Sequence, residues 1–170
     1  MYLFGIWKHN CVNPLPIDAR EKVARHIDAL FGEGVSEALP QDAAFEFSRR
    51  TGRIKNFSMA GRLAGTLRTD GGIALTIAGA QHFFEKSEKF RENCVAPVQE
   101  AVPFVTEGRS LFCRHVEWCG NAVRVGSDVA VIDKDKVIAV GAAILPANLM
   151  KQYSRGVAVK IREGLKGRTE

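Results

Sequence analysis

Apolar residues recur every three or four positions between residues 17 and 31, which is the spacing of one face of a helix. Pro14 and Pro16 precede this stretch, and Gly32 and Gly34 follow it, as is typical of a helix entry and a helix stop. The apolar positions are Ile17, Val23, Ile27, Leu30 and Phe31. The pattern predicts one amphipathic helix over residues 17–31.

The spacing changes to an alternation of apolar and polar residues from position 44 onward. Turns that contain glycine separate the alternating stretches, a pattern that favours an antiparallel meander. The predicted strands are 45–47, 53–59, 62–68 and 73–77. A helix over residues 79–88 is expected to cover the sheet. Residues 1–92 are therefore predicted to form an α+β domain, an antiparallel sheet with helices against one face.

Residues 93–170 consist mainly of short apolar stretches between glycines. They predict strands at 95–98, 110–118, 128–132, 137–144 and 156–162, with short helices over 101–106 and 148–153. This size and order of elements fits a mainly-β domain closed into a small barrel, which leaves few exposed sheet edges. No Gly/Ser linker separates the two domains at the predicted boundary, so we expect them to pack together.

Composition limits the protein to one ordinary domain or two small ones, because the chain has 170 residues of which 46% are hydrophobic. No apolar run approaches the roughly 18–20 residues that cross a bilayer, and the first residues lack the pattern of a secretory signal. The sequence thus predicts a cytoplasmic protein with no membrane partner.

Four single cysteines, with no C-x-x-C pair and no histidine at zinc-ligand spacing, predict neither a metal site nor a cofactor. Cys113 and Cys119 are interpreted as buried thiols that behave as small hydrophobes. A Cys/His site made from Cys11, His9 and His26 is a weaker interpretation. The chain also lacks a P-loop, a G-x-S-x-G elbow, an HExxH helix and a GxGxxG turn. We therefore expect no enzymatic activity and no catalytic residues.

The formal net charge of +5 is a mild excess, but the positive charges are unevenly distributed. Residues 47–69 contain six basic residues and no aspartate or glutamate: Arg49, Arg50, Arg53, Lys55, Arg62 and Arg68. Such a segment attracts phosphates. A solvated basic face is the alternative explanation.

Four motifs in the last third of the chain resemble the PUA domain, a small RNA-binding pseudo-barrel. They are Glu107-Gly-Arg-Ser-Leu-Phe112, Gly126-Ser-Asp-Val-Ala-Val-Ile-Asp133, Ala139-Val-Gly141, and Gly156-Val-Ala-Val159 preceded by Met150. Upstream, residues 48–55, 63–71 and 76–80 resemble the domain that precedes PUA in archaeal archaeosine tRNA transglycosylases and in small archaeal proteins of two such domains. The resemblance implies a PUA-like pseudo-barrel over residues 93–170.

In that family RNA lies across the turn after the first helix of the barrel and the edge of the last strands. Carried over, this implies RNA contacts by Gly108, Arg109 and Ser110 on the turn, and by Lys160 and Arg162 on the last strand. Arg49, Arg50 and Arg53 join them if both domains line one surface. The alternative explanation for Gly108 is a tight turn without RNA contact, and for Arg109 it is an arginine that is only solvated. Trp118 fits either a rim position or a base-stacking role, and His115 a structural role.

Two functions follow from these observations. The first is a non-catalytic RNA-binding protein that recognises structured RNA, such as tRNA or rRNA, in RNA modification or translation. The alternative is a protein-interaction adaptor, an accessory subunit of an RNA-modifying enzyme or of the ribosome. An enzyme acting alone ranks third, because an eight-stranded catalytic barrel takes about 200 residues or more.

Overall fold

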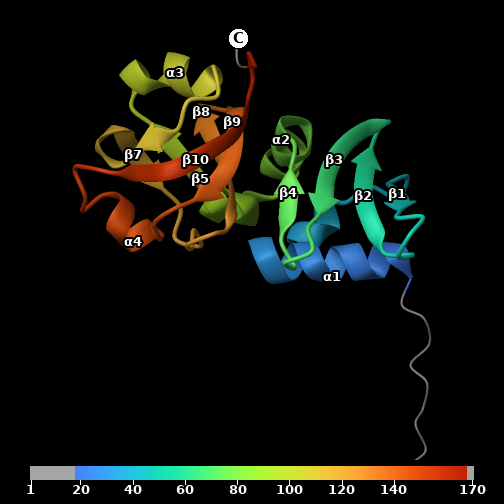
Figure 1. The fold of residues 1–170 in the computed structure, drawn as a ribbon. Coiled ribbons are helices and arrows are strands. Elements are labelled where there is room, and N and C mark those ends of the chain that lie inside the picture. Colours follow the sequence, from blue (N-terminus) through green and yellow to red (C-terminus); the bar gives the residue numbers. More distant parts are fainter. Residues whose placement is uncertain (1–17, 168–170) are drawn as a thin grey trace, which may run out of the picture.

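The computed structural model describes residues 18–167. The amino-terminal half of this part is a four-stranded antiparallel sheet with strand order β1-β2-β3-β4 (Figure 1). Its elements are α1 (Ala19–Phe31), the 3-10 turn η1 (Val35–Ala38), β1 (Ala44–Phe47), β2 (Ile54–Met59), β3 (Arg62–Leu67), β4 (Ile73–Leu75) and α2 (Ile77–Lys86). The predicted α+β arrangement of a meander with helices is confirmed.

Helix α1 buries Val23, Ile27 and Phe31, three of the five predicted apolar positions, whereas Ile17 lies outside the described residues. Helix α2 begins two residues earlier than predicted. The Thr76 hydroxyl accepts a hydrogen bond from the backbone N–H of Gly79 at 3.1 Å. Thr76 therefore ends the short strand β4 and starts the helix as its N-cap.

The carboxy-terminal half is a six-stranded mixed sheet with order β6-β10-β9-β8-β5-β7, rolled into a nearly closed pseudo-barrel. The pairing of β5 with β8 is parallel, and the other pairs are antiparallel. The elements are η2 (Glu88–Asn93), β5 (Cys94–Pro97), η3 (Gln99–Ala101), α3 (Val102–Thr106), β6 (Leu111–Phe112), η4 (Cys113–His115), β7 (Val116–Cys119), β8 (Asp128–Asp133), β9 (Lys136–Ala143), α4 (Ala147–Met150) and β10 (Val157–Gly164).

The prediction of one strand over residues 110–118 is wrong in its middle. Strand β6 pairs with β10 and strand β7 pairs with β5, at opposite ends of the strand order, so the chain must turn a corner between them. The 3-10 turn η4 makes this corner. Arg114 and His115 therefore lie in a turn rather than on opposite faces of a strand, and Arg114 Nε donates to His115 Nε2 at 3.0 Å.

The barrel has a core of its own, and a second hydrophobic core is shared by the two halves. Five residues of the barrel pack with the buried residues of the amino-terminal half: Cys94, Ala130, Ile132, Val137 and Val140. Phe90, in the connection η2, lies fully buried with its ring 5.4 Å from that of Phe31 and 5.8 Å from that of Phe83. The expected packing of the two domains against each other is present in the structure.

This shared core predicts that both halves unfold in one transition. Phe90→Ala should lower the free energy of unfolding by about 3–5 kcal/mol, because it removes a buried ring and leaves a cavity. Phe104→Ala, at an exposed position, is the matched control and should cost less than about 1 kcal/mol. Urea denaturation followed by circular dichroism and by tryptophan fluorescence tests both. Two separate transitions in the native protein would contradict the shared core.

Candidate nucleic-acid interface

The turn after α3 depends on Gly108, whose φ of +86° lies in the left-handed region that side chains disfavour. The backbone N–H of Gly108 donates to Val105 O at 2.9 Å, and that of Arg109 donates to Phe104 O at 3.0 Å. These bonds provide donors for carbonyl groups at the end of α3. Helices that end at a glycine commonly have such bonds. The turn is therefore fixed in place, and Gly108 itself is buried within it.

The end of β10 packs directly against this turn. A Cβ atom on Gly164 would lie 2.5 Å from both Gly108 N and Thr106 O, and Lys166 N donates to Thr106 O at 3.0 Å. This close approach forms a groove of about 370 Å³. Its lining residues are Gly108, Lys160, Ile161, Arg162, Glu163, Gly164 and Gly167. The structure thus brings together three of the residues that the sequence predicted: Gly108, Lys160 and Arg162.

A β-bulge orients the two cations of β10. Ile161 pairs with Gly141 and Glu163 pairs with Val140, so Arg162 is an extra residue without a partner of its own on β9. Lys160 and Arg162 are exposed, whereas Ile161 between them is buried in the barrel. Both cations therefore point out of the barrel at the groove.

Arg109 and Phe104 form a cationic and aromatic pair beside the groove. The Arg109 guanidinium lies 5.4 Å from the centroid of the Phe104 ring, and its Nε lies 3.6 Å from the Glu107 carboxylate. Phe104 is 53% exposed. Ser110 follows on the same turn and is partly buried. The sequence analysis did not identify Phe104 as a candidate. The available signal was its position next to Val105: a helix this short cannot bury two neighbouring apolar residues, so one of them is exposed.

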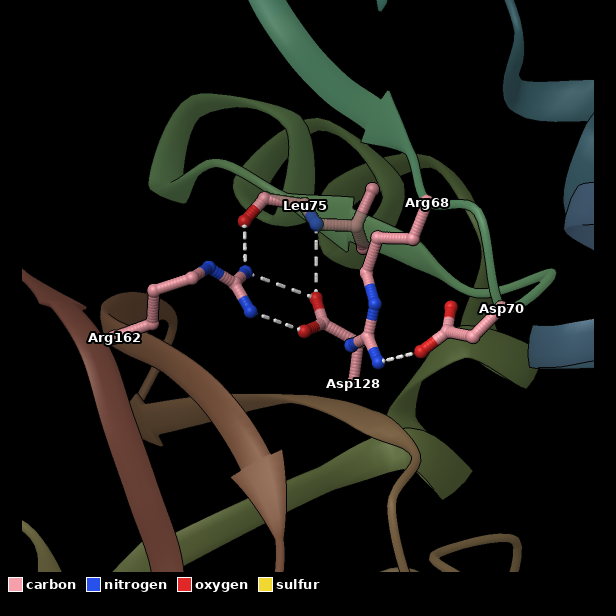
Figure 2. A network of polar contacts seen from close by, with 5 residues as sticks. All are labelled: Arg68, Asp70, Leu75, Asp128 and Arg162. Carbon is pink, nitrogen blue, oxygen red and sulfur yellow. Dashed lines mark hydrogen bonds and ion pairs between the residues drawn. The ribbon is translucent and has the colours of Figure 1, made fainter. Parts of the chain in front are cut away.

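Arg162 also belongs to a network between the two domains, shown in Figure 2. Its Nη1 donates to Asp128 Oδ1 at 2.5 Å and its Nη2 to Asp128 Oδ2 at 3.2 Å. The same Nη2 donates to the carbonyl of Leu75 at 2.6 Å, and the N–H of Leu75 donates to Asp128 Oδ2 at 2.8 Å. Arg162 therefore connects the groove of the barrel to strand β4 of the other domain.

The Asp128 side chain is only 4% exposed. Burial raises the pKa of its carboxyl, while the hydrogen bonds from Arg162 and Leu75 favour the charged form. Three hydrogen bonds from N–H groups reach its two oxygens, an arrangement that suits a carboxylate acceptor. Arg68 lies beside this carboxylate and is paired with Asp70. The hydrogen bond between them raises the pKa of Arg68 and lowers the pKa of Asp70.

The arginine triplet lies away from the groove. Arg49, Arg50 and Arg53 are exposed on the turn between β1 and β2, at one edge of the four-stranded sheet. The barrel contacts β4, the strand at the opposite edge (Figure 1). The structure therefore does not join the triplet to Gly108 and Lys160 in one groove, and an RNA role for the triplet stays a prediction.

Trp118 lies in a second groove, of about 1020 Å³, where the two domains meet. Its side chain is 38% exposed. The apolar floor of the groove includes Phe84 and Ile132, and Arg91 stacks on the Phe84 ring at 4.8 Å. Four carboxylates surround this floor: Glu85, Glu88, Glu92 and Asp135. Three cations, Lys86, Arg91 and Lys134, line the same groove, so its charges are mixed.

The described cysteines have structural surroundings. Burial raises the pKa of Cys94, and it raises the pKa of Cys119 to about 11, so both thiols are neutral at physiological pH. Within residues 18–167 no group of three histidine, cysteine or acidic side chains could hold a metal ion. His9 and Cys11 lie outside the described residues. None of the described helices is long and apolar enough to span a membrane.

Family models match both halves of the chain. A model of the PUA domain matches residues 98–165. A model described as the patch-forming domain C2 of tRNA-guanine transglycosylase matches residues 21–89. These matches confirm the resemblance that the sequence motifs indicated, and with it the assignment of the barrel to the PUA fold.

Curated relatives include tRNA-guanine(15) transglycosylases of archaea. That of Methanothermobacter thermautotrophicus is 31% identical over 150 residues, which cover 87% of this chain and 23% of the relative. That of Thermococcus kodakarensis is 32% identical over 150 residues, covering 87% of this chain and 26% of the relative. The chain therefore spans about a quarter of the length of the curated relatives it matches.

Solved structures share the fold over nearly their whole length. A hypothetical protein of Pyrococcus horikoshii superimposes with a TM-score of 0.67 at 18% identity, covering 85% of this chain and 89% of the other. A conserved PUA domain protein of Thermoplasma acidophilum gives 0.60 at 18% identity, covering 86% and 91%. At these identities the likeness concerns the fold alone.

The contact between Gly164 and the turn predicts a sensitive position. Gly164→Ala should lower the free energy of unfolding by about 1–3 kcal/mol, because its Cβ would meet backbone atoms that have to shift. Gly72→Ala is the control, since its Cβ would meet only the movable ends of Asp70 and Arg68. Thermal or urea denaturation measures both. Equal stability of the two variants would show that the turn is not held by this contact.

Proposed function

The chain belongs to the PUA-domain proteins that carry a patch-forming C2 domain ahead of the PUA domain, and on that premise we propose that it is a non-catalytic RNA-binding protein. The ligand is structured RNA such as tRNA. The observation that carries the proposal is the groove between the turn at Gly108 and the bulged strand β10.

The chemistry of this groove suits an RNA backbone. Gly108 is buried and its N–H is bonded to Val105, so its part is to hold the turn that carries Arg109 in place beside the groove. Lys160 supplies an exposed cation beside it. Arg109 and Phe104 add a charge and an exposed ring on which an unpaired base can stack. Recognition through backbone, 2′-hydroxyl groups and exposed bases is the mode that RNA permits, because the major groove of its double helix is closed to side chains.

Two features support a role without catalysis. Asp128, a buried carboxylate, accepts three N–H hydrogen bonds that hold it in the contact between the domains. The described thiols whose pKa is raised are neutral and so poor nucleophiles. In this proposal the protein delivers RNA to a separate modification enzyme or to the ribosome.

The second groove favours the adaptor function as the alternative. It exposes Trp118 among four carboxylates and three cations, and an exposed aromatic ring within a mixed charged rim suits a protein surface. In that alternative the partner protein binds at Trp118, and RNA is contacted only in the assembled complex.

Lys160→Ala and Arg109→Ala should each weaken binding to bulk tRNA without unfolding the protein. If each side chain neutralises one phosphate, its loss should also reduce the slope of log affinity against log salt by about one. Lys22→Ala, an exposed lysine on α1, is the control. Electrophoretic mobility shifts at several salt concentrations provide the measurement. Binding equal to that of the native protein in both variants would favour the adaptor.

Reversing the charge of Arg49, Arg50 and Arg53 to glutamate should weaken binding of whole tRNA and leave a short hairpin RNA unaffected. The reason is distance: the triplet lies at the edge of the sheet opposite the barrel, so only an RNA that extends across both domains can reach it. Unchanged affinity and salt slope for whole tRNA would confine the RNA site to the carboxy-terminal domain.

A further inference from the structure

Strand β4 presents its outer edge to the barrel, and side chains of the barrel complete its hydrogen bonds. β4 is the last strand of its sheet, and its pairing partner on the other side is β3. The N–H of Leu75 is bound by Asp128 and the carbonyl of Leu75 by Arg162. The Asp128–Arg162 pair therefore occupies the position that a neighbouring strand would take, and it satisfies peptide groups that would otherwise be buried without partners.

Arg162 is also a lining residue of the candidate RNA groove. Arg162 lines the groove with Gly108 and Lys160, and its side chain is 37% exposed, whereas Asp128 behind it is buried. The bonds to Asp128 and Leu75 use Nη1 and Nη2. Figure 2 shows the Arg162 side chain reaching from β10 to Asp128 and Leu75, which together hold its guanidinium.

We propose that Asp128 is a positioning residue for RNA binding, which touches no RNA but holds Arg162, the bulge of β10 and the edge of β4 in one arrangement. This inference rests on the proposed RNA-binding function. It assigns Arg162 a different role from Lys160, because the carboxylate of Asp128 already balances the charge of Arg162. Arg162 then shapes the groove and couples it to the amino-terminal domain, while Lys160 supplies the free positive charge.

Whether one substitution raises or lowers RNA affinity distinguishes a positioning role from simple electrostatics. Asp128→Asn removes a negative charge next to the groove, so electrostatics alone predicts tighter RNA binding. Loss of positioning predicts weaker binding instead, by about five- to tenfold, with an unchanged salt slope because no phosphate contact is lost. Glu163→Gln is the matched control: it removes a carboxylate that lines the same groove and takes no part in the hydrogen bonds to Arg162 or Leu75.

A readout without RNA tests the network itself. Hydrogen exchange followed by mass spectrometry should show that peptides covering β4 exchange about tenfold faster, or more, in Asp128→Asn. Peptides covering α1 should be unchanged, and Glu163→Gln should match the native protein. Affinities are compared only where circular dichroism shows the variant to be folded.

Arg162→Lys provides a second variant if Asp128→Asn does not fold. It keeps the positive charge but lacks the planar fork that reaches Asp128 and Leu75 together. It should therefore lower RNA affinity and raise exchange at β4 while the salt slope stays the same. Native RNA affinity together with native exchange at β4 in this variant would overturn the positioning role.

The outcomes distinguish the two proposals. If the native protein binds tRNA and Asp128→Asn binds as well or better, the positioning role is wrong and the RNA-binding function stands. If the native protein binds no RNA, the proposed function fails, and the positioning role for RNA fails with it, whatever the exchange at β4 shows.

Discussion

The outer edge of strand β4 is the constraint on which the junction of the two domains depends. A strand edge that enters an interface must find partners for its N–H and C=O groups, because burying them without partners costs free energy. At Leu75 the partners are one carboxylate and one guanidinium from the barrel. Since that carboxylate is itself buried, the pair is stable only with both members present, and removal of either leaves an uncompensated charge.

The eight residues of strand β10 make three kinds of structural contact. Its buried side chains complete the barrel core, its end packs on the turn at Gly108, and its bulge turns Arg162 toward β4. The groove therefore sits where the barrel closes and where the domains meet. In the proposed function, this arrangement gives the RNA a surface of fixed shape.

Local patterns predicted most of the elements, because helix spacing and alternation are properties of neighbouring residues. The helix at Val23, Ile27 and Phe31 and the four-stranded meander are of this kind. The corner at Cys113–His115 was missed, since it arises from closing β6 onto β10 and β7 onto β5, which lie far apart in the strand order.

The site was predictable in part. The family motifs indicated the turn at Gly108 and the last strand, and the structure places Gly108, Lys160 and Arg162 in one groove. Asp128 could not be recognised from sequence, because its partners Leu75 and Arg162 are 53 and 34 residues away. The position of the arginine triplet relative to the barrel likewise depends on domain packing, which no local pattern encodes.

Backbone amide chemical shifts of isotope-labelled protein, recorded during titration with tRNA, test the central claim most directly. The account predicts that the largest changes fall on residues 104–110 and 160–164, around the groove. Changes concentrated instead at Arg91 and Trp118, or no changes at any RNA concentration, would contradict it.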